Sequence, residues 1–214
     1  FADSMRKAAS QIGSTIYIGA QLLAEAPANW WNNTDRFWNE GVFQQTANIP
    51  DYYIIHSYYT PYNTNSNAAD ILETATSVTP NMMTFLQQAM TTAGVTKKPI
   101  AMTEYNIFST GSKQQASFIN GMHATIVLGE IIKNKYGMAA RWDLANGWNE
   151  GNDHGMFSQG DDGTAKWTPR STYYYMYYFQ KWFGDHMIES TVSGSDGVLA
   201  YASTFTSGEV SMVL

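Results

Sequence analysis

The stretch that decides the fold reads Pro99-Ile100-Ala101-Met102-Thr103-Glu104-Tyr105-Asn106. A short apolar run ends there in a carboxylate and two hydrogen-bonding side chains. This pattern predicts a buried strand over 99–103 that delivers Glu104 to its C-terminal end, the end at which parallel barrels carry their chemistry. A glutamate there suits a nucleophile, a general base or a metal ligand. The alternative is a glutamate at a helix N-terminus, where its charge favours the helix dipole.

Around this strand, apolar β-branched runs alternate with helical patterns. Strands are also predicted over 15–20, 51–58 and 138–143, and helices over 1–12, 35–48, 69–93, 113–134 and 170–183, with a break at Pro80 and a loop containing Gly111. From Met187 the period changes to two, which predicts strands over 187–188, 198–204 and 209–214. Strands that alternate with long helices indicate an α/β fold with a parallel sheet built by right-handed crossovers.

Four such units match half of a TIM (β/α)8 barrel, which needs about 250 residues. We therefore expect a half-barrel over residues 1–186 and the beginning of an antiparallel β-sandwich over 187–214. The chain starts in a helical pattern and ends within a strand, so it is expected to be part of a longer polypeptide.

The composition of the 214-residue chain excludes several classes of function. Hydrophobic residues make up 44% and charged residues 14%, which is enough apolar surface for a core and argues against disorder. The net charge is −6 and no cluster of Lys or Arg exists, so no nucleic-acid partner is expected. No apolar run approaches the length of a membrane span, so no membrane partner is expected. Without cysteine, the chain has neither disulfides nor thiolate chemistry.

Tyrosine and tryptophan are unusually frequent, with 14 and 7 copies. Their flat apolar faces and polar edges suit sugar rings, although the same residues also fill interfaces between helices and strands. No cofactor and no metal are expected. The carboxylate-rich set Asp143, Asp153, His154, Asp161 and Asp162 could bind a cation. Asp161-Asp162-Gly163 lacks the spacing of a calcium loop, however, and Asp-Gly pairs are common in turns, so a plain loop turn is expected.

The predicted strands bring a set of polar and aromatic side chains to one edge. The strand over 51–58 ends in His56, Ser57 and Tyr58, the next in Glu104, Tyr105 and Asn106, and the last in Trp142 and Asp143. A carboxylate, an imidazole, a phenol and an indole at one mouth are what cleavage of a sugar polymer requires: an anionic nucleophile, neutral donors and a stacking platform.

This order of motifs resembles the second half of a retaining (β/α)8 glycoside hydrolase. The resemblance covers most of the chain and is greatest to the large clan that contains arabinofuranosidases, β-xylosidases and agarases. It implies that Glu104 is the nucleophile, and that the acid/base glutamate precedes Phe1. Further implied substrate-binding residues are His56, Tyr58, Tyr105, Asn106, Trp142 and Trp148.

The resemblance also implies a carbohydrate substrate of plant or algal origin and a partner, the N-terminal half-barrel, from the same polypeptide or a second chain. A secreted or periplasmic bacterial enzyme is expected, although residues 1–20 lack the features of a signal peptide. In the clan that the chain resembles, the acid/base glutamate follows an asparagine at the end of a strand. Asn39-Glu40 is also an Asn-Glu pair, but it lies within a helical pattern, where glutamate is usually solvated. Glu150 is a weaker candidate, and Trp30 with Trp31 forms a further platform or packs between loop and helix.

Three other readings of the sequence remain open. A carbohydrate-binding module on a barrel scaffold would keep the aromatic residues but would have no use for Glu104. A different (β/α) enzyme would use Glu104 as a base or metal ligand and would need a second ligand nearby. A scaffold half would require a partner to cover its exposed sheet edges.

Overall fold

A computed structural model describes residues 1–62, 64–108 and 114–214. The contacts within the chain divide it into two compact units. The first unit consists of Phe1–Ser57, Pro80–Tyr105 and Tyr136–Ala140, and the second of Tyr58–Thr79, Asn106–Lys135 and Arg141–Leu214.

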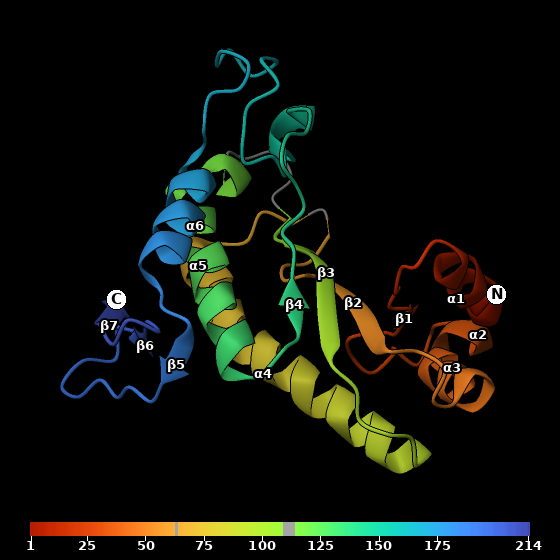
Figure 1. Ribbon diagram of the computed structural model, residues 1–214. Helices are drawn as coiled ribbons and strands as arrows, with labels where there is room; N and C mark the ends of the chain where they lie inside the picture. The colour runs from red at the N-terminus through yellow and green to blue at the C-terminus, as the bar shows by residue number, and fades with distance from the viewer. Residues whose placement is uncertain (63, 109–113) are drawn as a thin grey trace. The chain divides into compact units, whose positions relative to one another are not determined.

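The first unit is built on a four-stranded parallel sheet with the order β1-β2-β3-β4 (Figure 1). Its strands are β1 (Gly19–Gln21), β2 (Tyr52–Tyr58), β3 (Ile100–Asn106) and β4 (Met138–Ala139). Parallel neighbours that are consecutive in the chain require crossover connections, and the intervening helices provide them.

Alternate residues of the two central strands supply the core of this sheet. Tyr53 and Ile55 of β2 and Ile100 and Met102 of β3 are almost completely buried. At the edge, β1 lies so close to β2 that a Cβ atom on Gly19 would come within 2.5 Å of the Tyr52 ring. Glycine is therefore required at this position for its lack of a side chain.

Three short helices belong to the first unit: α1 (Ala2–Gln11), α2 (Asn33–Arg36) and α3 (Trp38–Thr46). Asp51 anchors α1 to the start of β2, because its carboxylate accepts hydrogen bonds from Arg6 Nη2 at 2.9 Å and from the backbone N–H of Ile18 at 2.7 Å. These two bonds lower the pKa of Asp51, the backbone bond most strongly.

Helix α4 (Ala68–Ala93) continues through Pro80, so the predicted break there is wrong. A proline inside a helix costs about 3 kcal/mol. Buried side chains lie on both sides of it, among them Ile71 before the proline and Met82 and Leu86 after it. Each buried side chain of this size contributes about 1.5–3 kcal/mol, so together they outweigh the proline.

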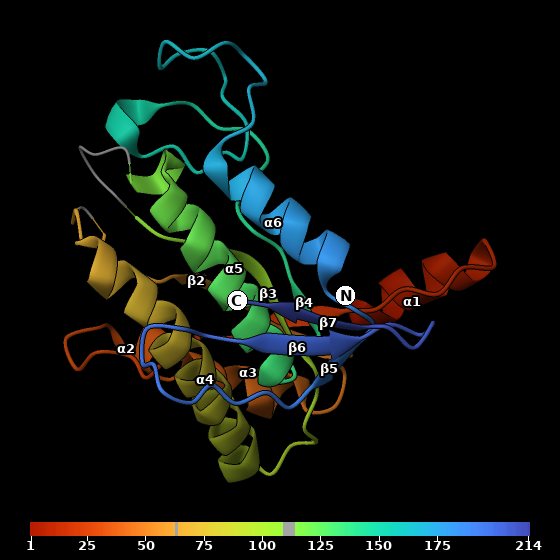
Figure 2. The ribbon, with the colours of Figure 1, turned by 90° about the vertical axis from the view of Figure 1, so that its left-hand side faces the viewer.

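The second unit contains α5 (Phe118–Lys133) and α6 (Ser171–Trp182), which pack side by side (Figure 2). Two single-turn helices belong to the same unit: η1 (Gln114–Ala116) precedes α5, and η2 (Asn149–Gly151) lies between β4 and α6 in the chain. Ser117 caps the N-terminus of α5, because its hydroxyl oxygen accepts a hydrogen bond from the Ile119 N–H at 3.2 Å. The predicted start of this helix at 113, like the loop at Gly111, lies outside the described residues.

A three-stranded antiparallel sheet completes the second unit, with the order β5-β6-β7. Its strands are β5 (His186–Ile188), β6 (Tyr201–Thr204) and β7 (Val210–Val213) (Figure 2). Tyr201 joins the sheet to α5 by donating its hydroxyl hydrogen to Glu130 Oε1 at 3.0 Å, and both residues are buried. Burial, together with the negative charge of Glu130, raises the pKa of Tyr201. The domain boundary between residues 186 and 187 stays a prediction.

Two predicted strands are shorter than expected. In β1, pairing starts only at Gly19 because β2, its sole partner among the described residues, begins at Tyr52. Strand β4 ends at Ala139, two residues before Arg141, whose own guanidinium donates to the backbone carbonyl of His154 at 2.6 Å. Within the described part of the chain, no helix combines the length and apolarity needed to cross a membrane.

Candidate active site

Glu104 lies near the C-terminal end of β3, in the first unit. The His56 ring reaches it from β2, with Nδ1 at 3.5 Å from Glu104 Oε2. Parallel neighbouring strands end at the same edge of a sheet, so the strand pattern predicts this pairing. The Glu104 side chain is 26% exposed, which leaves the carboxylate open to a ligand while the imidazole restricts its orientation.

Thr103 fixes the other side of the His56 ring, and the sequence analysis missed it. Its hydroxyl oxygen lies 2.9 Å from His56 Nε2. The direction of this hydrogen bond depends on the tautomer of the ring. If the Thr103 hydroxyl donates to Nε2, the Nδ1 hydrogen faces Glu104, and if Nε2 donates to Thr103, Nδ1 faces Glu104 as an acceptor. Thr103 is part of the motif that ends in Glu104, and a polar side chain so close to the strand end was the available signal.

Tyr105 follows Glu104 on β3 and is only 1% exposed. A side chain enclosed to this degree supports the strand end and offers no open surface to a sugar. Its predicted part in substrate binding stays a prediction.

Asn106 belongs to the second unit and connects three segments there. Its amide nitrogen donates to the Trp142 carbonyl at 2.5 Å, and its amide oxygen accepts from Asn120 Nδ2 at 3.1 Å and from the Ile107 N–H at 2.8 Å. The residue is 1% exposed. These contacts hold the backbone of Trp142 in place, which is a positioning role, and direct binding of substrate by Asn106 stays a prediction.

Arg141 reinforces the same segment and is a second residue that the sequence analysis missed. Its guanidinium donates to the His154 carbonyl at 2.6 Å and approaches Asn106 Oδ1 at 3.4 Å. The carbonyl of His154 also accepts the backbone N–H of Asp143 at 3.2 Å. Asn106 therefore binds the backbone of Trp142 itself, while its two neighbours, Arg141 and Asp143, bind the carbonyl of His154.

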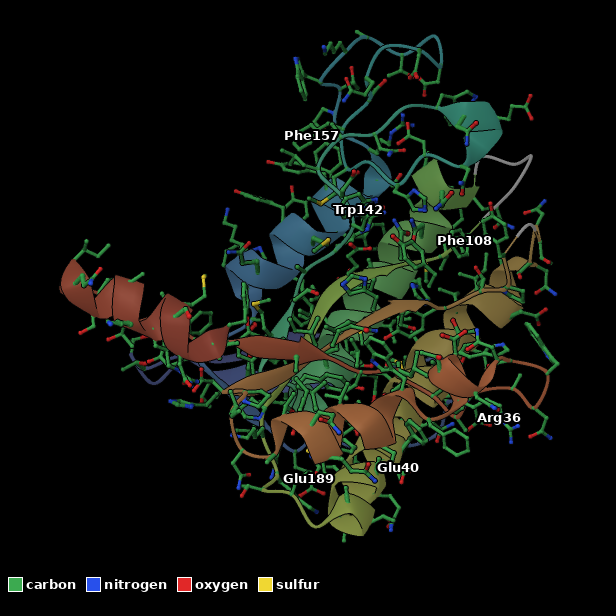
Figure 3. The ribbon with its side chains drawn as sticks, turned by 90° about the vertical axis from the view of Figure 1, so that its right-hand side faces the viewer. Arg36, Glu40, Phe108, Trp142, Phe157 and Glu189 are labelled. Carbon is green, nitrogen blue, oxygen red and sulfur yellow. The ribbon has the colours of Figure 1, made fainter. Side chains whose placement is uncertain are left out.

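Trp142 presents its ring to solvent, with 42% of the residue exposed, although its backbone is held firmly (Figure 3). An exposed indole offers a flat apolar face to a sugar ring, and the hydrogen bond to its backbone carbonyl fixes the position of the residue on the loop. Trp148, from the same loop, is half-buried, and the Arg170 guanidinium lies over its ring at 5.7 Å from the centroid.

Aromatic rings surround His154 in the second unit. Tyr58 lies edge-on to the His154 ring at 5.5 Å between centroids, and Tyr58 also stacks on Phe108 at 4.5 Å. Burial, helped by the positive charge of Arg141, lowers the pKa of His154 to about 4. The ring is therefore neutral at pH 7. The sequence showed His154 only as part of a turn, because its burial depends on residues distant in the chain.

The acidic residues of the loop over 144–168 are used in an ion-pair network. Arg170 Nη2 lies 2.5 Å from Asp153 Oδ2, and Arg170 Nη1 lies 3.1 Å from Asp162 Oδ2. Asp153 is completely enclosed, and burial raises its pKa in spite of Arg170. For Asp162, hydrogen bonds from Thr164 and Ser158 together with the charge of Arg170 exceed the effect of burial and lower the pKa. Over residues 1–62, 64–108 and 114–214, no group of three or more His, Asp or Glu residues is arranged to hold a metal ion.

The predicted site residues thus occur in both units. His56, Glu104 and Tyr105 belong to the first unit, and Tyr58, Asn106, Trp142 and Trp148 to the second. Glu40, the imitation of the acid/base motif, is exposed on α3 and accepts a hydrogen bond from Gln44 Nε2 at 2.8 Å, as expected for a solvated helix residue.

Comparison with known proteins identifies the fold. No protein-family model and no curated protein matches the chain. Among solved structures, it is similar to an α-L-arabinofuranosidase from Thermotoga maritima in an arabinose complex, with 15% identity, a TM-score of 0.62, and coverage of 99% of this chain and 41% of the other. A GH51 arabinofuranosidase from Xanthomonas axonopodis pv. citri gives 15% identity, a TM-score of 0.64, and coverage of 99% and 46%.

A GH39 β-xylosidase from Caulobacter crescentus matches with 12% identity, a TM-score of 0.52, and coverage of 95% of this chain and 40% of the other. The chain therefore has a fold found in glycoside hydrolases and spans less than half the length of these structures. The predicted fold class is confirmed: four parallel strands with helices, followed by an antiparallel sheet, in a share of the longer chains that is consistent with half a barrel.

Proposed function

We propose that this chain is the nucleophile-bearing half of a retaining glycoside hydrolase that acts on a plant or algal polysaccharide or its oligosaccharides. The observation that carries the proposal is the partly exposed carboxylate of Glu104 at a strand end of a parallel sheet, 3.5 Å from the imidazole of His56. The similarity in fold to arabinofuranosidases and a β-xylosidase supports the reaction class.

In this mechanism Glu104 attacks the anomeric carbon of the sugar as a carboxylate. The glycosidic C–O bond breaks, the leaving oxygen takes a proton from a second carboxylic acid, and a glycosyl ester forms on Glu104. Water then cleaves the ester with the second carboxyl group acting as base, which restores both residues. We place this second group in the part of the barrel that this chain does not supply, about 5–5.5 Å from Glu104, as retention requires.

The other predicted residues are assigned to substrate contacts. His56 orients the nucleophile from the neighbouring strand, with Nδ1 at 3.5 Å from Glu104 Oε2. Trp142 stacks on the apolar face of a sugar ring, while Tyr58 and Trp148 contact neighbouring hydroxyls and rings. Asn106 acts through Trp142, whose backbone carbonyl it binds.

The test is Glu104→Gln in the full-length protein, measured by hydrolysis of chromogenic arabinofuranosides and xylosides. The variant keeps the size and shape of the side chain but replaces one carboxylate oxygen by an NH2 group and cannot attack, so turnover is expected to fall by at least about 10⁴-fold with little change in stability. Glu189→Gln, at an exposed glutamate of the second unit, is the matched control and should retain full activity.

A fluorosugar inhibitor that traps the glycosyl ester should label Glu104. Labelling of another residue, or substantial turnover by Glu104→Gln, would exclude this nucleophile. Sugar binding without hydrolysis by the full-length wild-type protein would instead favour a carbohydrate-binding module.

A further inference from the structure

A hollow of about 440 Å³ opens in the first unit, lined by Trp30, Trp31, Asn32 and Asp35. The two indole rings stand nearly perpendicular, with centroids 5.9 Å apart and an angle of 71° between their planes. Trp30 is 85% exposed, so it contributes almost nothing to the core of the unit. Packing between loop and helix, one of the two roles predicted for this pair, therefore does not account for Trp30.

The loop that carries these rings is held by side chains outside the hollow. Asn39 binds Leu23 in both directions, accepting its N–H at 2.7 Å and donating to its carbonyl at 3.0 Å. Trp38 Nε1 donates to the carbonyl of Gln21 at 3.0 Å. These bonds hold the start of the loop, and beside the rings the backbone N–H of Trp31 donates to the Ala28 carbonyl at 3.0 Å. The backbone that carries the aromatic pair is therefore bonded at both places, which lowers the cost of ordering it when a ligand binds.

The polar edge of the hollow carries both acceptors and donors. Asn32 Nδ2 donates to Asp35 Oδ2 at 2.6 Å, and Asn32 Oδ1 accepts the Asp35 N–H at 3.0 Å. Each side chain keeps further capacity: one N–H on the amide and a second oxygen on the carboxylate. Among the residues that the structure describes, no cationic side chain lines the hollow, which disfavours sulfate or phosphate groups. Arg36, next in sequence, lies with its guanidinium over Phe37 at 5.8 Å (Figure 3).

We infer that this hollow is a binding subsite for a neutral sugar ring of the polysaccharide. Indole faces accept the apolar face of a sugar, and the amide and carboxylate pair binds its hydroxyls, a combination that suits neither an anion nor a fully apolar ligand. A volume of about 440 Å³ has room for more than one ring. The inference rests on the proposed function for its ligand class but not on the catalytic role of Glu104.

The experiment uses the full-length protein with Glu104→Gln, so that substrate is not consumed. Neutral hexasaccharides from arabinan, xylan and agarose are titrated in a calorimeter against this parent and against the same protein with Trp30→Ala. Loss of one stacked ring should raise Kd about fivefold to tenfold for the oligosaccharide that binds. Trp30→Phe, which keeps an aromatic face, should recover part of the affinity.

Trp182→Ala is the matched control, because Trp182 is an exposed tryptophan on α6 of the other unit. It should bind like the parent. Equal affinity of parent and Trp30→Ala, an equal loss in Trp182→Ala, or failure of the parent to bind any of the three hexasaccharides would overturn the inference. Binding that depends on Trp30 in a protein whose wild type hydrolyses no glycoside would refute the proposed function and leave this subsite standing.

Discussion

The Arg170 network gives the most quantitative prediction about the second unit. Arg170 is 7% exposed, and its guanidinium neutralises Asp153, which is fully enclosed, and Asp162, which is 9% exposed. Arg170→Met keeps most of the volume of the side chain but leaves both carboxylates without their cation. Breaking a buried ion pair by removing one partner costs about 3–5 kcal/mol, because the remaining charge stays out of water.

The measurement is chemical denaturation of the full-length protein, followed by tryptophan fluorescence. Arg36→Met is the control, because Arg36 is exposed and should change the free energy of unfolding by less than about 0.5 kcal/mol. Arg170→Met combined with Asp153→Asn should cost less than the sum of the two single changes, since one uncompensated charge disappears. A loss below about 1 kcal/mol for Arg170→Met, or strict additivity in the double variant, would refute this reasoning.

Two further predictions concern Asn106 and Asp51. Asn106→Ala removes the hydrogen bonds to Trp142, Asn120 and the backbone N–H of residue 107. The free energy of unfolding, measured by hydrogen exchange, should therefore fall by about 2–4 kcal/mol. A fall of less than about 1 kcal/mol would show that these hydrogen bonds contribute little to stability. The pKa of Asp51 is lowered in the folded state, so its contribution to stability is complete above the unfolded pKa of about 4 and is lost as the pH falls through the folded value. The difference in melting temperature between wild type and Asp51→Asn should therefore stay constant from pH 7 to about 5 and shrink below pH 4, and a constant difference down to pH 2.5 would contradict this assignment.

The sequence predicts the parallel strands, and it names Tyr58 first and His56 second as candidate donors to Glu104, because both predictions follow from local patterns. Apolar runs define the strands, and neighbouring parallel strands end at one edge, so the polar residues that follow them meet there. The burial of Met102 and Ile55 in the sheet follows from the same alternation.

The parts that the sequence did not predict depend on contacts between distant residues. Arg141 and Arg170 resemble ordinary surface cations in the sequence, yet Arg141 binds a carbonyl 13 residues away and Arg170 a carboxylate 17 residues away. In the sequence, Pro80 predicts a helix break because the low helix propensity of proline is a local property. In the structure, buried side chains before and after Pro80 stabilise one continuous helix. Strand β4 ends early for a similar reason, since the loop contacts of Arg141 begin where its pairing stops.

The hydrogen bond between Tyr201 and Glu130 has a consequence for anyone who divides or recombines this protein. An exchange of the C-terminal strands for those of a relative, or a truncation before them, would remove the phenol and leave the buried carboxylate of Glu130 with only Lys133 and Asn134 as polar partners among the described residues. Glu130 and the residue that meets it therefore have to be transferred together, and successful chimaeras should have their crossover points upstream of α5, away from the start of the terminal sheet.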